Sequence, residues 1–208
     1  MKYWSDGTIE RFEVRLVLIG YTKQESIDFT KIFSPVVKMT TREFVLDLLK
    51  EYTCIEYGAI CSPLDPTIKL KAKEGTPLED PTYYRKMMDK LNFLTNTRLD
   101  IAFGVQHLNQ FMQEPKEPQL KAAYHVLRYL KGDPTLGVSM SNDADLSVRA
   151  YYDSDWASCP DSRRSVSGYI VLLGSSPLSW ISKKHDIVSL SSAEAEYKSL
   201  RKVVGELI

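Results

Sequence analysis

The chain has 208 residues, of which 43% are hydrophobic and 26% are charged, an ordinary composition for a globular protein. Its 27 basic and 27 acidic residues give a formal net charge of zero, which excludes attraction of nucleic acid by bulk charge and leaves only local patches for such contacts. Three cysteines without a C-x-x-C pair fit a reducing compartment better than a disulfide framework.

The N-terminal segment has no recognisable export signal, because its first 20 residues lack the apolar stretch and the small-residue cleavage site of a signal peptide. No window of the chain approaches about 18 apolar residues, the length that a membrane span requires. We therefore expect an intracellular protein, cytoplasmic or nuclear, with no membrane partner.

The first 82 residues predict a strand, a helix and a loop. Residues 9–21, "IERFEVRLVLIGY", are rich in β-branched and aromatic residues and end in a turn at Gly20, which indicates a strand. Residues 40–52, "TTREFVLDLLKEY", follow a threonine cap and place apolar residues at helical spacing. Residues 53–82 contain "CSPLDP" and "KEGTPLEDP" without sustained periodicity, which indicates a long loop or linker.

Residues 83–131 predict three helices, and the pattern changes after them. The helical stretches are "YYRKMMDKLNFLTN", "DIAFGVQHLNQFM" and "PQLKAAYHVLRYLKG". From "LSVRAYYD" onward apolar residues alternate, and we expect antiparallel strands near 146–153, 168–174 and 177–183 and a helix from about 191. The fold class is therefore expected to be α+β.

Two glutamates at the start of this last helix predict different roles. Ser191 and Glu194 have the S-x-x-E spacing of a capping box. Glu196 instead shares a face with an apolar stripe, where a carboxylate needs a partner. That stripe consists of Leu200, Val203, Val204 and Leu207. Asp153 ends the first strand, and a strand-end aspartate with a helix glutamate facing it can form a divalent-ion site. A turn cap and a locally paired boundary residue are the competing interpretations.

Two groups of basic residues are candidate phosphate contacts. Lys121, His125 and Arg128 recur at i, i+4 and i+7 on one helix face. The second group occurs in the predicted turns and strand ends of the C-terminal sheet and consists of Arg163, Arg164, Lys183 and Lys184. With a net charge of zero, solvated surface charges are the competing interpretation of both groups.

The residues quoted above resemble a known family. "YYDSDWASCPDSRRSVSGYIVLLGSSPLSWISKKHDIVSLSSAEAEY" resembles the ribonuclease H region of copia-type LTR-retrotransposon Pol polyproteins. "YYRKMMDKLNFLTNTRLDIAFGVQHLNQFM" and "KAAYHVLRYLKG" resemble the segment that joins reverse transcriptase to ribonuclease H in that family. "RLVLIGYTKQESIDFTKIFSPVVKMTTREFVLDLL" resembles the start of its reverse transcriptase. The resemblance covers nearly the whole chain.

The resemblance implies an incomplete catalytic apparatus. Asp153 and Glu196 correspond to metal-binding acids of the ribonuclease H region, where Mg²⁺ is the cofactor. The D-V-x-x-A-F and Y-V-D-D motifs of the polymerase palm do not occur, and the family's further catalytic aspartates would follow the last helix. Family "TRPD" is "TRLD" here, and the family's glutamine is His185. We expect no tight Mg²⁺ binding, because two-metal hydrolysis needs several carboxylates.

The expected organisation follows from the same resemblance. Residues 1–52 are expected to be a reverse-transcriptase remnant, 53–82 a linker across a deleted palm, 83–135 a helical connecting segment and 136–208 a partial ribonuclease-H-like unit. The expected function is that of a degenerate, catalytically inactive Pol remnant, whose ancestral class is RNA-directed DNA polymerase and ribonuclease H. The alternative is a retained module that binds an RNA–DNA hybrid or a protein. An exposed sheet edge also predicts self-association.

Overall fold

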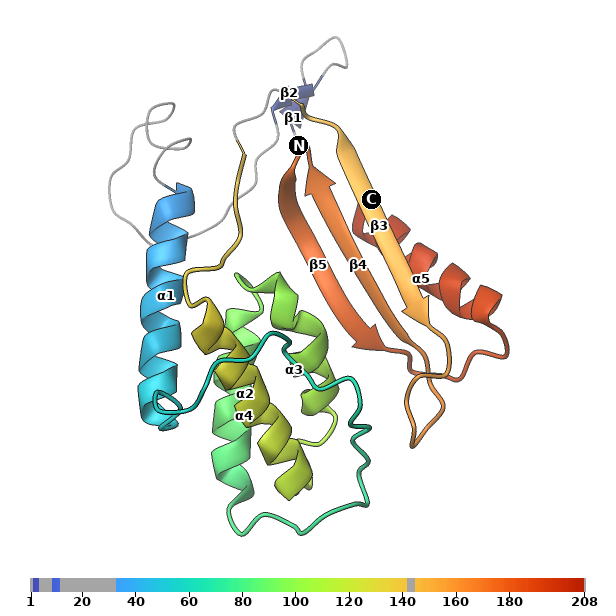
Figure 1. Cartoon of the computed structure of the whole chain (residues 1–208). Coiled ribbons are helices and arrows are strands. Elements are labelled where there is room, and N and C mark those ends of the chain that lie inside the picture. Colours follow the sequence, from blue (N-terminus) through green and yellow to red (C-terminus); the bar gives the residue numbers. More distant parts are fainter. Residues whose placement is uncertain (1, 4–8, 12–32, 142–144, 208) are drawn as a thin grey trace.

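The computed structural model describes residues 2–3, 9–11, 33–141 and 145–207, and it has an α+β fold (Figure 1). Strands β1 (Lys2–Tyr3) and β2 (Ile9–Arg11) pair in antiparallel orientation. The strand predicted over 9–21 is therefore observed at its first three residues, and the rest of it lies outside the described residues. None of the described helices is both long enough and apolar enough to cross a membrane.

Helix α1 (Phe33–Glu51) begins earlier than the predicted threonine cap near residue 40. Pro35 does not prevent this start, because a proline in the first helical turn removes an amide that has no partner inside the helix. Thr41 is consequently an interior residue of the helix and is buried. The predicted apolar face is confirmed, since Val45, Leu48 and Leu49 are buried.

Residues 53–80 form the long loop that the sequence predicts, and side chains of α4 (Glu117–Gly132) hold it in place. Arg128 Nε donates a hydrogen bond to the Gly58 carbonyl at 2.9 Å. Lys131 Nζ donates to two further carbonyls of the loop, at 2.6 and 2.7 Å. The loop is therefore fixed through its main chain, by donors on a neighbouring helix.

The helices of the first two thirds of the chain share one hydrophobic core. They are α1, α2 (Pro81–Leu94), the short 3-10 helix η1 (Leu99–Ile101), α3 (Ala102–Asn109) and α4. Fully buried members of the core are Val45, Cys54, Tyr84, Met87, Met88, Leu91, Ile101, Val105, Leu108, Val126, Leu127 and Leu130. The core thus contains residues from both sides of the expected boundaries at 52 and 82, and these segments pack as one helical unit.

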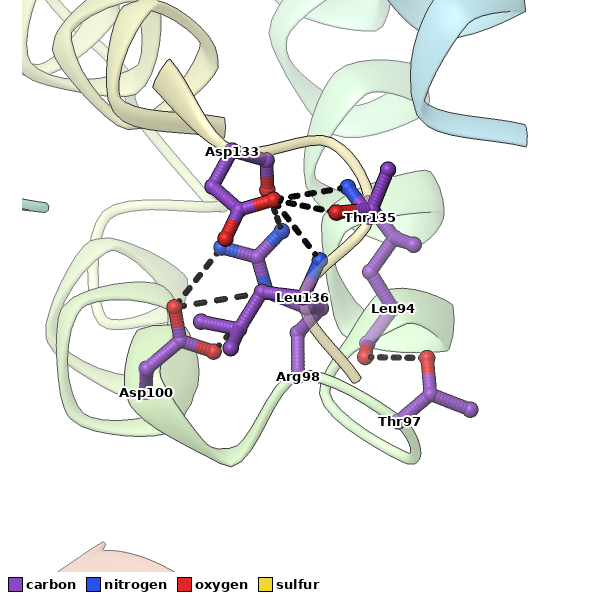
Figure 2. Close-up of polar contacts among 7 residues, drawn as sticks. All are labelled: Leu94, Thr97, Arg98, Asp100, Asp133, Thr135 and Leu136. Carbon is purple, nitrogen blue, oxygen red and sulfur yellow. Dashed lines mark hydrogen bonds and ion pairs between the residues drawn. The ribbon is translucent and has the colours of Figure 1, made fainter. Parts of the chain in front are cut away.

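A buried arginine joins the end of α2 to the end of α4 (Figure 2). Arg98 is 1% exposed, and it donates to both carboxylate oxygens of Asp100, with distances of 2.8 to 3.3 Å, and to the Asp133 carbonyl at 2.8 Å. Burial raises the pKa of the Asp100 carboxyl, but the hydrogen bonds and charge of Arg98 outweigh it and the net shift is downward. The Asp133 carboxylate accepts the amides of Thr135 and Leu136. The chain that leaves α4 is thereby tied to the turn before α3.

The C-terminal part is a three-stranded antiparallel sheet covered on one face by helix α5 (Ser192–Leu207), as Figure 1 shows. In spatial order its strands are β3 (Val148–Asp155), β4 (Val166–Leu173) and β5 (Ser176–Lys184). They confirm the three strands that the alternating pattern predicts, and α5 starts within one residue of its predicted position.

The pleat divides the side chains of the sheet between two surroundings. Trp180 Nε1 donates to the Thr95 carbonyl at 2.8 Å, so the face that carries Trp180 is turned to the helical unit. Ser179 Oγ donates to a Glu206 carboxylate oxygen of α5 at 2.8 Å, on the opposite face. Because side chains alternate along a strand, the register of the sheet places Asp153 on the Trp180 face.

Small and polar side chains fill the contact between α5 and the sheet. Ser167 Oγ donates to Ser154 Oγ at 3.1 Å and also forms a hydrogen bond with His185 Nε2. From the helix, Ser199 Oγ donates to the Asp153 carbonyl at 3.2 Å. Ser154, Ser167, Ser199 and His185 are all buried. Of these hydrogen bonds, the one from Ser199 joins α5 to the sheet, and the other two link β3, β4 and the chain after β5.

The rotation of α5 differs from the prediction. The sequence predicts that larger apolar residues pack on the sheet, namely Leu200, Val203, Val204 and Leu207. Only Val203 of these is buried, whereas Val204 and Leu207 are 46% and 45% exposed. The buried line of α5 instead consists of Ala195, Ser199 and Val203. On the sheet face that this line meets, Ser154 and Ser167 are buried.

Replacing Arg98 by alanine leaves the Asp100 carboxylate, which is 22% exposed, without its buried partner. We expect the free energy of unfolding to fall by about 3 kcal/mol, as for other buried ion pairs that lose one member. Arg201→Ala, on the exposed side of α5, is the matched control and should change it by less than about 0.5 kcal/mol. Urea unfolding measures both variants. Equal stability of the two would contradict a structural role for Arg98.

The stability of the chain should fall in mild acid because of His185. Burial lowers the pKa of this side chain from its ordinary value of 6.5, and Lys202 and Lys198 lower it further against the opposing charges of Asp186 and Glu194. Below about pH 6.5 the unfolded chain therefore binds more protons than the folded chain, which favours unfolding. His185→Gln removes this titration and keeps a hydrogen-bonding group. By urea unfolding, wild type should lose more stability than the variant between about pH 7.5 and about pH 5.5. An identical loss in both proteins would contradict the assignment.

Candidate functional site

Asp153 lies near the end of β3, on the sheet face that is turned to η1 and α3. With Tyr151 and Trp180 of the sheet and Phe103 of α3 it lines an open cavity of about 340 Å³. The residue is exposed, and its carbonyl rather than its carboxylate takes the hydrogen bond from α5. The carboxylate therefore belongs to the crevice between the sheet and the helical unit.

The two glutamates at the start of α5 have different surroundings. Glu194 accepts the Leu190 amide at 2.7 Å and pairs with the Lys198 ammonium at 2.6 Å. Its own amide donates to Ser191 Oγ at 3.1 Å, which confirms the predicted capping role. The pKa of the Glu194 carboxyl lies below its usual value, mainly because of the hydrogen bond from Lys198 and also because of the one from the Leu190 amide. Glu196 lies half-buried on the flank of the helix.

Asp153 and Glu196 do not share a face of the sheet. Asp153 belongs to the face turned to α3, whereas Glu196 is on the helix that covers the opposite face. The resemblance implies that these acids bind Mg²⁺, an ion that demands near-octahedral oxygen coordination. Carboxylates on two sides of one strand do not supply it. Within the described residues, no group of three or more His, Cys, Asp or Glu side chains is placed to hold a metal ion. The expectation of no tight Mg²⁺ binding stays a prediction.

The basic stripe predicted on α4 divides between two environments. Arg128 Nε donates to the Gly58 carbonyl and is engaged with the loop main chain. Lys121 and His125 instead line a cavity whose wall also includes residues of the long loop. A loop far away in the sequence thus engages one donor of Arg128, and phosphate contact by Lys121, His125 and Arg128 stays a prediction.

The second group of basic residues comes from the β3–β4 turn and from the end of β5. Arg163 and Arg164 lie in the turn between β3 and β4, where the Arg164 carbonyl accepts the Cys159 amide at 3.1 Å. Lys183 and Lys184 are consecutive residues of β5, so their side chains leave opposite faces of the sheet. Lys184 Nζ lies 3.7 Å from Cys159 Sγ. Lys184 thus lies against the turn that holds Arg163 and Arg164, and phosphate contact by these four residues stays a prediction.

A second cavity, of about 560 Å³, opens between the long loop, α3, α4 and the β3–β4 turn. Its charged and aromatic lining residues are Asp65, Lys69, Phe103, His107, Lys121 and His125. The rings of Phe103 and His107 stack with planes 8° apart and centroids separated by 6.3 Å. The sequence interpretation named Lys121 and His125 but missed these two rings. Their i, i+4 spacing on α3 is the signal that could have found them.

Two histidines line this cavity, and their ring nitrogens can form hydrogen bonds there. Burial lowers the pKa of His107, and the charge of Lys184 lowers it further, which favours the neutral ring. His125 Nε2 is buried and has no hydrogen-bond partner among the described residues. With the exposed Lys69 and Lys121 at the same cavity, the site combines positive charge, a stacking surface and an unused ring nitrogen.

Comparison with known proteins gives a consistent set of relatives. The retrovirus-related Pol polyproteins from transposons RE1 and RE2 of Arabidopsis thaliana are 42% and 40% identical to the chain over 169 residues, which is 81% of the chain. An uncharacterized mitochondrial protein of Arabidopsis thaliana is 36% identical over 150 residues, 71% of the chain and 62% of that protein.

These matches cover only part of the length of the related proteins. The chain spans only 12% of the length of the two polyproteins. No family model matches the chain, and no solved structure matches it significantly. The identity to the polyproteins nevertheless extends over four fifths of this sequence. The chain therefore belongs to the family of retrovirus-related Pol polyproteins of transposons.

Proposed function

We propose that the chain is a Pol-derived segment that carries part of a ribonuclease-H-like unit on a helical platform and does not itself cleave nucleic acid. The antiparallel order β3-β4-β5 followed by α5 supports the ribonuclease-H-like assignment. The ancestral activities are reverse transcription and cleavage of the RNA strand in RNA–DNA hybrids.

The observation that supports the inactive state is that Asp153 lies by register on the sheet face opposite to the one that α5, which carries Glu196, covers. In-line hydrolysis with two metal ions needs carboxylates that converge on both ions from one side. A strand has to turn over, or slip by one residue against β4, before Asp153 reaches the face of α5. Such a slip breaks eight paired positions between β3 and β4.

We expect the purified chain to show no cleavage of an RNA–DNA hybrid above a buffer control, with either Mg²⁺ or Mn²⁺. Asp153→Asn and Glu196→Gln should leave that background unchanged, because neither acid completes a metal site. The measurement is release of labelled RNA fragments from a fixed hybrid. Primer extension should also remain at background, since the palm motifs do not occur in this sequence. Cleavage that either variant abolishes would overturn the proposal.

A second candidate function is binding of nucleic acid at the 560 Å³ cavity. Phe103 and His107 offer an aromatic surface on which a base can stack, and base–aromatic stacking tolerates every sequence. Lys69 and Lys121 place positive charge at the same cavity. A neutral chain with one such local site is expected to bind weakly and with a strong dependence on salt.

Lys69→Glu with Lys121→Glu should weaken binding of an RNA–DNA hybrid or a single strand at least tenfold and should reduce the salt slope. The slope falls because fewer phosphate counterions are released when two lysines are lost. Fluorescence anisotropy at several salt concentrations measures both quantities. Lys86→Glu, an exposed position on α2, is the control. Equal affinity in the double variant and the control would remove this candidate function.

A further inference from the structure

The cavity of about 560 Å³ is built from segments that lie well inside the described chain. Its walls come from the long loop, α3, α4 and the β3–β4 turn, all within residues 64–160. Its volume falls within the range of about 300–1,000 Å³ that is typical of pockets for small organic ligands. A pocket of this size can hold one nucleotide.

Close packing fixes the long loop at the cavity, so this wall is formed before any ligand arrives. Leu64 lies against Gly104 of α3, where a Cβ atom added to the glycine would be 3.2 Å from Leu64 Cγ. A larger residue at position 104 would therefore push the loop away from α3. Farther along the loop, the Ala72 amide donates a hydrogen bond to the Asp161 carboxylate of the β3–β4 turn at 2.9 Å. The loop is thus attached both to α3 and to the turn.

Two near-parallel rings of α3 give the cavity an aromatic wall. Phe103 and His107 line it, and their ring planes differ by only 8°. Phe111, which is 6% exposed, packs edge-on against the His107 ring, with the ring centroids 5.8 Å apart. The His107 ring is therefore held in its orientation. The Phe103 side chain is 50% exposed and remains accessible to a planar ligand.

His125 of α4 brings an unpaired hydrogen-bonding atom to the same cavity. Its Nε2 atom is buried and forms no hydrogen bond with any residue that the structure describes. Buried polar atoms of this kind are rare, because a hydrogen bond that was made to water in the unfolded chain is lost without replacement. A ligand that places a donor or an acceptor at this point satisfies the nitrogen, according to the tautomer of the ring.

Positive charge borders the cavity. Lys69 of the loop and Lys121 of α4 line it and are exposed. Neither lysine takes part in an ion pair within the part of the chain that the structure describes. Asp65 adds one negative charge, but its Oδ1 atom accepts the amide and the hydroxyl of Thr67, at 2.9 and 2.6 Å. The two lysines therefore leave an excess of positive charge that a phosphate group can match.

We infer that this cavity binds one unpaired nucleobase together with its phosphate. The inference rests on the second candidate function, nucleic-acid binding at this cavity, and specifies the form of the ligand. In a duplex the neighbouring bases cover both faces of each base, and only base edges are reachable through the grooves. Stacking on Phe103 and His107 therefore requires a base outside a duplex. His125 then contacts the base edge, while Lys69 and Lys121 contact the phosphate.

Competition between ligands tests the form of the nucleic acid. By fluorescence anisotropy, the full chain should bind a labelled oligoadenylate strand at least about tenfold more tightly than the same strand paired in an RNA–DNA hybrid. Displacement of the strand by adenosine 5′-monophosphate would support the inference and assign the site to free nucleotides. Displacement by unlabelled strand alone would support it and assign the site to single strands.

Two negative outcomes of this competition have different meanings. Equal affinity for the strand and for the hybrid would overturn the inference and leave nucleic-acid binding at the cavity in place. No binding of either ligand would remove both the inference and the candidate function on which it rests.

Side-chain replacements test the two contacts to the base. Phe103→Leu keeps an apolar side chain but removes the aromatic face, and it should weaken strand binding at least about fivefold. Phe93→Leu, at an exposed phenylalanine of α2, is the matched control and should leave the affinity unchanged. His125→Leu should weaken binding about threefold or more, whereas His125→Gln retains a hydrogen-bonding group and should weaken it less. Equal affinities of the two phenylalanine variants, or full affinity of His125→Leu, would contradict the inference.

Discussion

The buried Arg98 guanidinium fixes the arrangement on which the other parts of the structure depend. It bonds the Asp100 carboxylate and the Asp133 carbonyl at the same time, and these residues belong to the entry of α3 and the exit of α4. A charge buried to this extent is stable only when its donors are satisfied. The two helix ends therefore cannot separate without exposing an unpaired charge. The segment that leads to β3 starts from this anchored point, and the Val138 amide continues the attachment by donating to the Thr97 carbonyl at 3.0 Å.

Much of the fold could be predicted from the sequence where the pattern is local. Alternation over residues 146–153 located β3, and the spacing of Ser191 and Glu194 located the start of α5. The rotation of α5 could not be predicted in the same way. Hydrophobicity favoured its larger apolar residues, whereas the buried line of α5 is Ala195, Ser199 and Val203. Which face of a helix is buried depends on the surface it meets, and that surface comes from strands formed elsewhere in the chain.

The candidate site illustrates the same limit. The resemblance selected Asp153 and Glu196. Whether two such acids converge depends on which face of the sheet a strand residue points to and on which face the helix covers. The hydrogen bonding of Arg128 depends on a loop about 70 residues away, because that loop provides the carbonyl to which Arg128 donates. The aromatic cavity combines α3, α4 and two loops. Each single stretch of the sequence contributes only a few of the residues that line this cavity, so no stretch by itself indicates a site.

The attachment of the long loop to α4 distributes evolutionary constraint unevenly between the two segments. The loop offers main-chain carbonyls to Arg128 and Lys131, and every amino acid carries that same acceptor. Most loop side chains can therefore change without loss of these bonds. The donors on α4 have no such freedom, because only a long cationic side chain reaches across. Substitutions should accumulate readily along residues 55–58, while positions 128 and 131 tolerate few replacements.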